Sequence, residues 1–244
     1  MEFIDCIWEV ENLGEKVLEI NFEKNDVVDS VELHQLYSDF QYVVAKVPMK
    51  MLEINHTLSS LGFVLAETQI SLSKSYKSFD FDDRLIKMLY PHVRLEEIQT
   101  SQELEAIISR ISSDMFSTDR IFLDGHFSKD ASSQRYKNWM KSEFFKNSST
   151  IYRMMYDEEC VGFGMDRFQN GIYTGLLGGI FKDSQSAGLA LCTGGGRFID
   201  CHKRNAPFKK MKTSISSNNM PVVQVYNHMG YKVDNLTYVF IKHN

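Results

Sequence analysis

The chain has 244 residues, of which 43% are hydrophobic and 24% charged, an ordinary balance for a globular protein of one large domain or one and a half small ones. Its formal net charge of −5 argues against the basic surface that nucleic acids and anionic membranes attract. The longest nearly uncharged stretch, residues 170–181, is too short and too rich in glycine to span a bilayer, and the acidic N-terminus is unlike a signal peptide. The four scattered cysteines include no CxxC pair, which favours free thiols over disulfides or a zinc site. We therefore expect a soluble cytoplasmic protein with no nucleic-acid or membrane partner and no metal.

The first regular pattern is a strand, a helix and a second strand. Residues 42–47 are rich in valine and predict a strand, and apolar residues at helical spacing predict a helix over 49–61. Gly62 then stands where a helix C-cap is expected, before an alternating strand over 63–72. The serine- and aspartate-rich stretch 73–83 is interpreted as a linker.

A longer series of elements follows from about Val93. In chain order the patterns predict a helix from Thr100 or Ser101 to Ser112, a loop over 120–129, a helix over 132–146, strands over 150–156, 159–168 and 171–181, a helix from about 185, a strand over 211–216, a helix over 221–229 and a strand over 236–242.

The two series share a unit at an offset of 168 residues. Aligning Gly62 with Gly230 places the first strand–helix–strand unit over the last one and keeps the alternation of both final strands. One interpretation is that any strand–helix–strand unit ends its helix with a glycine before the next strand. The other is a duplicated half-domain that kept its packing and lost its chemistry, because Tyr226 falls on Leu58 and Asn219 on Met51.

The most informative stretch is Gln185-Ser186-Ala187-Gly188-Leu189-Ala190, at the junction of a predicted strand and helix. Its small residues let the backbone approach a ligand, and the free N–H groups of a first helical turn bind a diphosphate. The stretch resembles motif A of the GNAT acetyltransferases, Gln/Arg-x-x-Gly-x-Gly/Ala, which grips the diphosphate of coenzyme A. The alternative is an ordinary helix start.

A second stretch, from Asn219 to Tyr231, resembles the GNAT signature Asn-x-x-small-x-x-x-Tyr-x-x-x-Gly-aromatic. Asn219, Tyr226, Gly230 and Tyr231 have its spacing, and only Val222 is bulkier than the usual residue. Both motifs occur in the family's order and on the expected elements. The resemblance implies an α/β (α+β) GNAT fold with a mixed central sheet and flanking helices. It divides the chain into a truncated GNAT-like N-terminal domain with its linker (1–83) and a GNAT acetyltransferase domain (84–244).

The same resemblance implies acetyl-CoA as the cofactor, bound between two splayed parallel strands. Tyr226 would be the general acid that protonates the departing thiolate. Asn219 would bond the pantetheine or only cap the last helix. No carboxylate lies on the strand 171–181, so the base would be His126, Asp124 or water. The expected cofactor-binding residues are Leu177, Gly178, Gly179, Ile180, Gln185, Ser186, Ala187, Gly188, Leu189, Ala190 and Asn219.

One departure concerns Gly194, Gly195 and Gly196, which fall inside the helix after motif A. Each costs about 1 kcal/mol relative to alanine in a helix. The helix is therefore expected to kink, to begin irregularly or to pack closely against a neighbour.

Aromatic, basic and carboxylate residues around 119–127 and 134–139 suit a sugar or a nucleobase. With a truncated N-terminal half before the core, this layout resembles dTDP-fucosamine N-acetyltransferase and related nucleotide-amino-sugar enzymes. It implies an acceptor that is a nucleotide-linked (dTDP-) amino-deoxysugar for surface polysaccharide, and a homodimer. The alternative is that Tyr136 and Trp139 only face the core. The expected substrate-binding residues are Arg120, Phe127, Arg135, Tyr136, Trp139 and Tyr173.

Two other functions remain open from the sequence. One is an acetyltransferase acting on a protein, a peptide or an antibiotic amine. The other is a non-catalytic acyl-CoA-binding module, which the missing base favours and Tyr226 disfavours.

Overall fold

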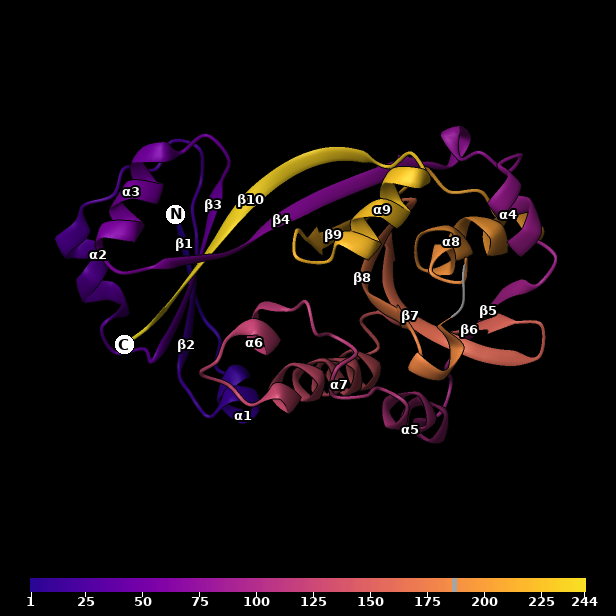
Figure 1. Cartoon of the computed structure of the whole chain (residues 1–244), viewed down its shortest axis with the longest axis horizontal. Coiled ribbons are helices and arrows are strands. Elements are labelled where there is room, and N and C mark those ends of the chain that lie inside the picture. Colours follow the sequence, from indigo (N-terminus) through magenta and orange to yellow (C-terminus); the bar gives the residue numbers. More distant parts are fainter. Residues whose placement is uncertain (186–187) are drawn as a thin grey trace.

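A computed structural model describes residues 1–185 and 188–244 of the chain. Ten strands form one mixed sheet in the order β1-β2-β3-β10-β4-β9-β8-β7-β6-β5 (Figure 1). The strands are β1 (Glu2–Asp5), β2 (Val17–Asn21), β3 (Tyr42–Pro48), β4 (Val64–Ser75), β5 (Val93–Glu97), β6 (Thr150–Tyr156), β7 (Glu159–Gln169), β8 (Ile172–Ile180), β9 (Lys210–Ser216) and β10 (Lys232–His243).

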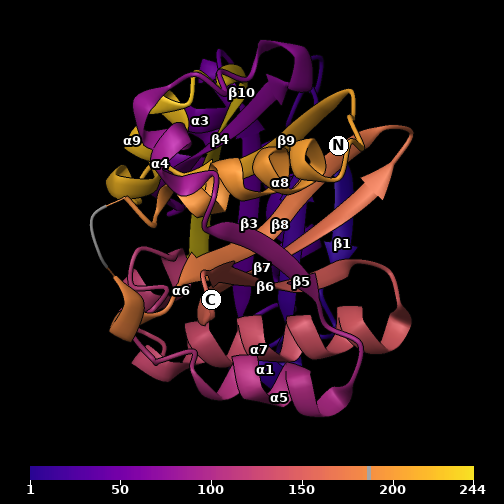
Figure 2. The ribbon, with the colours of Figure 1, turned by 90° about the vertical axis from the view of Figure 1, so that its right-hand side faces the viewer.

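Helices cover both faces of this sheet. Figure 2 shows α5 and α7 below the strands of the C-terminal half and α8 above them. The helices are α1 (Glu9–Leu13), α2 (Ser30–Tyr37), α3 (Leu52–Ser60), α4 (Arg84–Leu89), α5 (Ser101–Ser109), α6 (Arg120–Leu123), α7 (Lys129–Lys146), α8 (Leu191–Lys203) and α9 (Met220–His228), with short 3₁₀ turns at Tyr76–Ser78 and Lys182–Ser184. Within the described ranges, no helix is both long and apolar enough to cross a membrane.

The repeated strand–helix–strand unit is present in the structure. The bounds of β3, α3 and β4 coincide with those of β9, α9 and β10 after a shift of 168 residues. The two copies exchange their last strands, since β10 lies between β3 and β4, and β4 lies between β10 and β9. The long strands β4 and β10 consequently join the two halves of the molecule (Figure 1).

Three local predictions differ from the structure. Residues 73–75 of the predicted linker continue β4, because they pair with Lys210–Lys212 of β9. The predicted loop 120–129 begins with the short helix α6, which the Asp119 carboxylate caps and which buries Ile121 completely. Helix α8 begins at Leu191 rather than near 185, since residues 188–190 form a turn in which Gly188 has a φ of +96°. The sequence analysis predicted no element before residue 41, and it did not predict helix α4.

Candidate functional site: a split between β8 and β9

The central feature of the C-terminal half is a pair of parallel strands that separate. Strands β8 and β9 pair from Ile172 with Lys210 to Gly175 with Thr213, and the pairing stops there. Beyond this point β8 continues to Ile180 and β9 to Ser216 without a common ladder. A bulge between Gly175 and Leu177 on the β7 side marks the same place. The strands therefore open toward their carboxyl ends, as the resemblance implied.

Backbone groups of β8 face this opening. The Phe181 N–H donates to the Val161 carbonyl of β7 at 2.9 Å. Because bonded and non-bonded pairs alternate along an antiparallel ladder, the N–H and C=O groups of Gly178 and Ile180 point away from β7. They point toward the side on which β9 has diverged. Of the four predicted β8 residues, these two present backbone groups to the opening, whereas Leu177 and Gly179 turn theirs to β7.

The phenol of Tyr226 lies at the point where the two strands part. Tyr226 is buried, and its hydroxyl lies beside the side chain of Thr213, the last residue of β9 paired with β8. The Thr213 hydroxyl in turn donates to the Gly175 carbonyl at 3.2 Å. Burial raises the pKa of the Tyr226 phenol to about 12, so the phenol keeps its proton at neutral pH. The site thus holds a protonated donor at the apex of the opening.

The glycines of α8 allow this placement. A Cβ atom on Gly194 would lie 3.0 Å from the Met229 sulfur and 3.2 Å from Tyr226 Cε1. The Tyr231 hydroxyl also donates to the Gly194 carbonyl at 2.8 Å. Helix α8 is continuous from Leu191 to Lys203, and the contacts at Gly194 support the close-packing interpretation for that residue. At Gly195 and Gly196 an added Cβ would meet its nearest neighbours at an ordinary 3.5 Å.

The diphosphate motif lies between β8 and α8. Gln185 and Ala190 are exposed, Leu189 is buried, and the N–H groups of Leu191 to Thr193 bond back to the turn at Gly188–Ala190. The helix that was expected to start near 185 therefore begins at Leu191, after this turn. Ser186 and Ala187 lie outside the described residues. Diphosphate binding here stays a prediction.

Asn219 caps α9, with its side-chain oxygen accepting from the Val222 N–H at 3.3 Å. The neighbouring Asn218 donates to the Ala66 carbonyl of β4 at 3.2 Å. The segment after β9 is therefore bound directly to Ala66 of β4, which also lines a groove.

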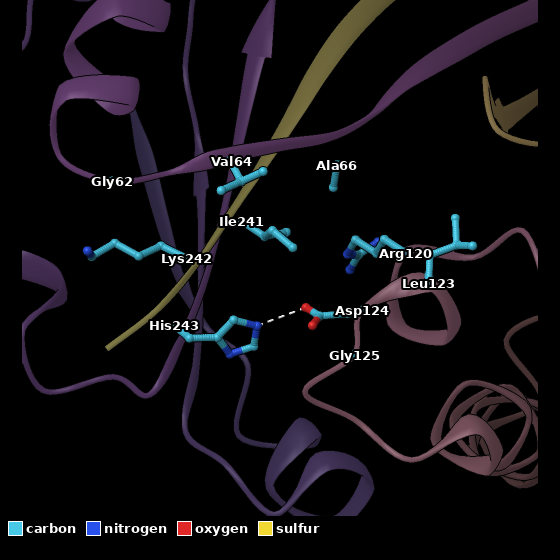
Figure 3. Close-up of a pocket in the computed structure, with 10 residues that line it drawn as sticks. All are labelled: Gly62, Val64, Ala66, Arg120, Leu123, Asp124, Gly125, Ile241, Lys242 and His243. Carbon is cyan, nitrogen blue, oxygen red and sulfur yellow. Dashed lines mark hydrogen bonds and ion pairs between the residues drawn. The ribbon is translucent and has the colours of Figure 1, made fainter.

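This groove has a volume of about 560 Å³ and lies between β4, β10 and the segment around α6 (Figure 3). Its walls combine apolar side chains with both signs of charge. The lining residues are Gly62, Val64, Ala66, Arg120, Leu123, Asp124, Gly125, Ile241, Lys242 and His243. The predicted residues Arg120 and Asp124 thus share one groove.

Arg120 is nearly buried beside Glu67, with 3.7 Å between a guanidinium nitrogen and the carboxylate. Its Nε finds no hydrogen-bond partner among the described residues. Asp124 accepts from the His126 N–H through one carboxylate oxygen and contacts His243 Nε2 at 2.8 Å through the other. His126 itself contacts Glu15 at 2.6 Å.

The remaining predicted substrate residues make contacts within the protein. Phe127 packs edge-on against Tyr42, and Arg135 is paired with buried Glu9 at 2.6 Å. Tyr136 donates to Asp119 at 3.0 Å, Trp139 donates to Glu143 at 3.3 Å, and Tyr173 packs beside Arg197 under α8. These contacts agree with the alternative that the aromatic side chains of α7 are structural, and a role in substrate binding stays a prediction.

The sequence analysis missed Thr213 and His243. Neither belongs to a motif, and each gains its place through strand pairing with residues far away in the chain.

No protein family and no curated protein matches this sequence. Solved structures do resemble the fold. A GCN5-related N-acetyltransferase from Sphaerobacter thermophilus has a TM-score of 0.54 and 9% identity, over 83% of this chain and 59% of that chain. The present chain therefore spans less than two thirds of that protein's length.

Two further structures are informative about architecture. A tandem GNAT protein from the clavulanic acid biosynthesis pathway has a TM-score of 0.50 and 9% identity, over 87% of this chain and 66% of that one. A GCN5-related glucosamine N-acetyltransferase region of a fungal multi-domain β-N-acetylglucosaminidase has a TM-score of 0.57 and 10% identity. The match covers 93% of this chain and 30% of that one. At these identities the likeness establishes the fold alone. The chain has a mixed α/β GNAT fold built on a ten-stranded sheet with flanking helices.

Proposed function

We propose that the protein is an acetyl-CoA-dependent N-acetyltransferase that uses the opening between β8 and β9. The observation that carries this proposal is the position of the Tyr226 phenol at Thr213, where the paired strands separate. A fold-level likeness alone would not identify an enzyme. A protonated donor at the apex of a backbone-lined opening is a specific chemical arrangement.

The backbone chemistry of the opening supports the proposed cofactor. The backbone groups of Gly178 and Ile180 are available to pair with the amides of a pantetheine arm, as in the addition of a strand to a sheet edge. The turn Gly188–Ala190 would hold the diphosphate, and Asn219 marks the β9 side. When bound, acetyl-CoA supplies a thioester whose transfer to an amine releases a thiol.

Tyr226 holds the proton that this release requires. Its pKa of about 12 leaves the phenol neutral at physiological pH, which makes it a hydrogen-bond donor toward sulfur. Proton donation by a positioned side chain contributes about 10²–10⁴-fold to a rate. For the acceptor amine, Asp124 has both oxygens engaged and His126 is paired with Glu15. We therefore propose a water molecule in the groove as the base.

The finer proposal is that the groove receives a nucleotide-linked amino-deoxysugar. Arg120 offers positive charge for phosphate, and the apolar side chains of Val64 and Ile241 offer a surface for a base or sugar ring. One structural neighbour is a glucosamine N-acetyltransferase region, which supports amino sugars as a class of acceptor. The Ala66–Asn218 bond supports continuity between the groove and the end of β9.

The test is thiol release from acetyl-CoA with a panel of dTDP- and UDP-linked amino sugars, free glucosamine and peptide amines. We expect turnover with one nucleotide sugar and a fall in kcat of about 100-fold in Tyr226→Phe at neutral pH. Tyr90→Phe is the matched control, because its hydroxyl contacts His202 at the far side of α8. Turnover with peptide amines alone would overturn the sugar proposal. A kcat of Tyr226→Phe equal to that of the unmodified chain would overturn the role of the phenol.

A second candidate is a module that binds acyl-CoA without catalysis. It is favoured by the absence of a carboxylate from β8, all of whose residues are described. Acetyl-CoA binding without thiol release on any amine of the panel would select it.

A further inference from the structure

Three segments far apart in the chain bring metal-ligating side chains together near the groove. Glu15 follows α1, His126 lies between α6 and α7, and His243 ends β10. Each offers one ligand atom, and these atoms all lie within 4.8 Å of one another. Figure 3 shows His243 and Asp124 in contact at the end of the groove.

Two of the donor atoms are shielded from solvent and unpaired. Glu15 Oε2 and His243 Nδ1 have no hydrogen-bond partner among the described residues. The other atoms of the same side chains are engaged, Glu15 Oε1 with His126 Nε2 at 2.6 Å and His243 Nε2 with Asp124 at 2.8 Å. Buried polar atoms normally have a partner, so these two indicate one that the protein chain does not provide.

The arrangement of His243 is characteristic of a metal-bound imidazole. Its Nε2 contacts a carboxylate, which fixes the ring and leaves Nδ1 as the free ligand atom. The rings of His126 and His243 lie with centroids 4.1 Å apart and planes tilted by 30°. The two imidazoles are therefore close enough to bind one cation together.

We propose that Glu15, His126 and His243 bind one divalent transition-metal ion of the Zn²⁺ class. Two imidazoles and one carboxylate are ligands that Zn²⁺ accepts at about 2.0–2.2 Å, while Mg²⁺ requires an octahedron of oxygen atoms. Tetrahedral ligands at that distance lie about 3.4 Å apart, so the side chains close in by roughly 1 Å. A fourth position remains for water or a ligand in the groove. The ion joins the N-terminal half, the α6–α7 segment and the last strand.

The test uses the untagged full chain, stripped with a chelator and titrated at pH 7.5 with Zn²⁺ and separately with Mg²⁺. We expect one tightly bound Zn²⁺ per chain, a raised melting temperature with Zn²⁺, and neither effect with Mg²⁺. His126→Gln, at a half-exposed position, should weaken Zn²⁺ binding by about tenfold or more and remove the shift. His56→Gln, at an exposed position of α3, should change neither the affinity for Zn²⁺ nor the Zn²⁺-induced rise in melting temperature.

Substitution with Co²⁺ provides a readout that does not depend on stability. A three-ligand site with one open position predicts the intense visible absorption of low-coordinate Co²⁺, without the near-ultraviolet band of a cysteine thiolate. The absence of stoichiometric Zn²⁺ binding would overturn the proposal. So would binding that survives His126→Gln and His243→Gln in variants with a native circular dichroism spectrum, or a thiolate band that assigns the metal to cysteine.

Discussion

Asp166 and Arg197 form the most deeply buried ion pair among the described residues. Asp166 on β7 is fully buried, and Arg197 of α8 contacts its Oδ2 through Nε at 2.9 Å and through a terminal nitrogen at 2.8 Å. The guanidinium also lies over the rings of Tyr152 and Tyr173, at 4.4 and 4.8 Å. The pair fixes α8 on the sheet beneath the proposed cofactor site.

Removing one charge of this pair should be costly. Asp166→Asn leaves a buried guanidinium without its counter-charge, and we expect the free energy of unfolding to fall by about 3 kcal/mol or more. Asp183→Asn is the matched control, because Asp183 pairs with Arg110 at the surface and should cost about 1 kcal/mol or less. Urea unfolding of both variants measures the difference. Equal destabilisation would contradict the assignment of the buried pair as the stabilising one.

Residues of the site differ in how far the sequence could predict them. Tyr226 and Asn219 were predictable because their spacing is local to one helix, and the helix cap is confirmed. Thr213 and His243 were not, since their roles depend on the neighbours that strand pairing gives them. The internal contacts of Arg135 and Tyr136 were equally hidden, because Glu9 and Asp119 lie on other elements.

At the scale of elements, periodicity predicted the strands and helices of the C-terminal half closely. The strand predicted over 150–156 has the same bounds as β6. The exceptions have local causes. A helix of four residues such as α6 is too short to show a period, and its stability comes from burying Ile121 under an Asp119 cap. Helix α8 starts late because Gly188 adopts a positive φ that ends any regular helix there.

At the scale of the whole molecule, the exchange of β4 and β10 could not be read from the sequence. The repeat at 168 residues indicated two similar units, yet both simple and exchanged pairings satisfy the same alternation. In the structure β4 pairs with β9 through residues 69–75 and with β10 on its other edge. The predicted boundary at residue 83 therefore divides the chain without dividing the sheet.

This exchange makes each half dependent on the other. Residues 84–244 expressed alone would leave β9 and β10 without the strand between them, and we expect no cooperative thermal unfolding by circular dichroism. Co-expression with residues 1–83 should restore a complex that elutes as one species and unfolds cooperatively. Cooperative unfolding of 84–244 alone, at the melting temperature of the full chain, would contradict this account.

The central claim, that acetyl-CoA binds in the opening between β8 and β9 with its diphosphate at the turn before α8, is tested most directly by calorimetric titration of acetyl-CoA. Gly188→Ala places a methyl group on that turn, while Gly14→Ala is the matched control at the end of α1. Both glycines have a positive φ, +96° and +74°, and no non-neighbouring atom of the described residues lies within 4 Å of the added Cβ, so both substitutions carry a similar backbone strain.

We predict that the unmodified chain binds one acetyl-CoA, that Gly188→Ala weakens binding by about tenfold or more, equivalent to about 1.4 kcal/mol, and that Gly14→Ala leaves the affinity unchanged. An unmodified chain that binds no acetyl-CoA, or a Gly188→Ala variant that binds as tightly as the Gly14→Ala control, would contradict the claim.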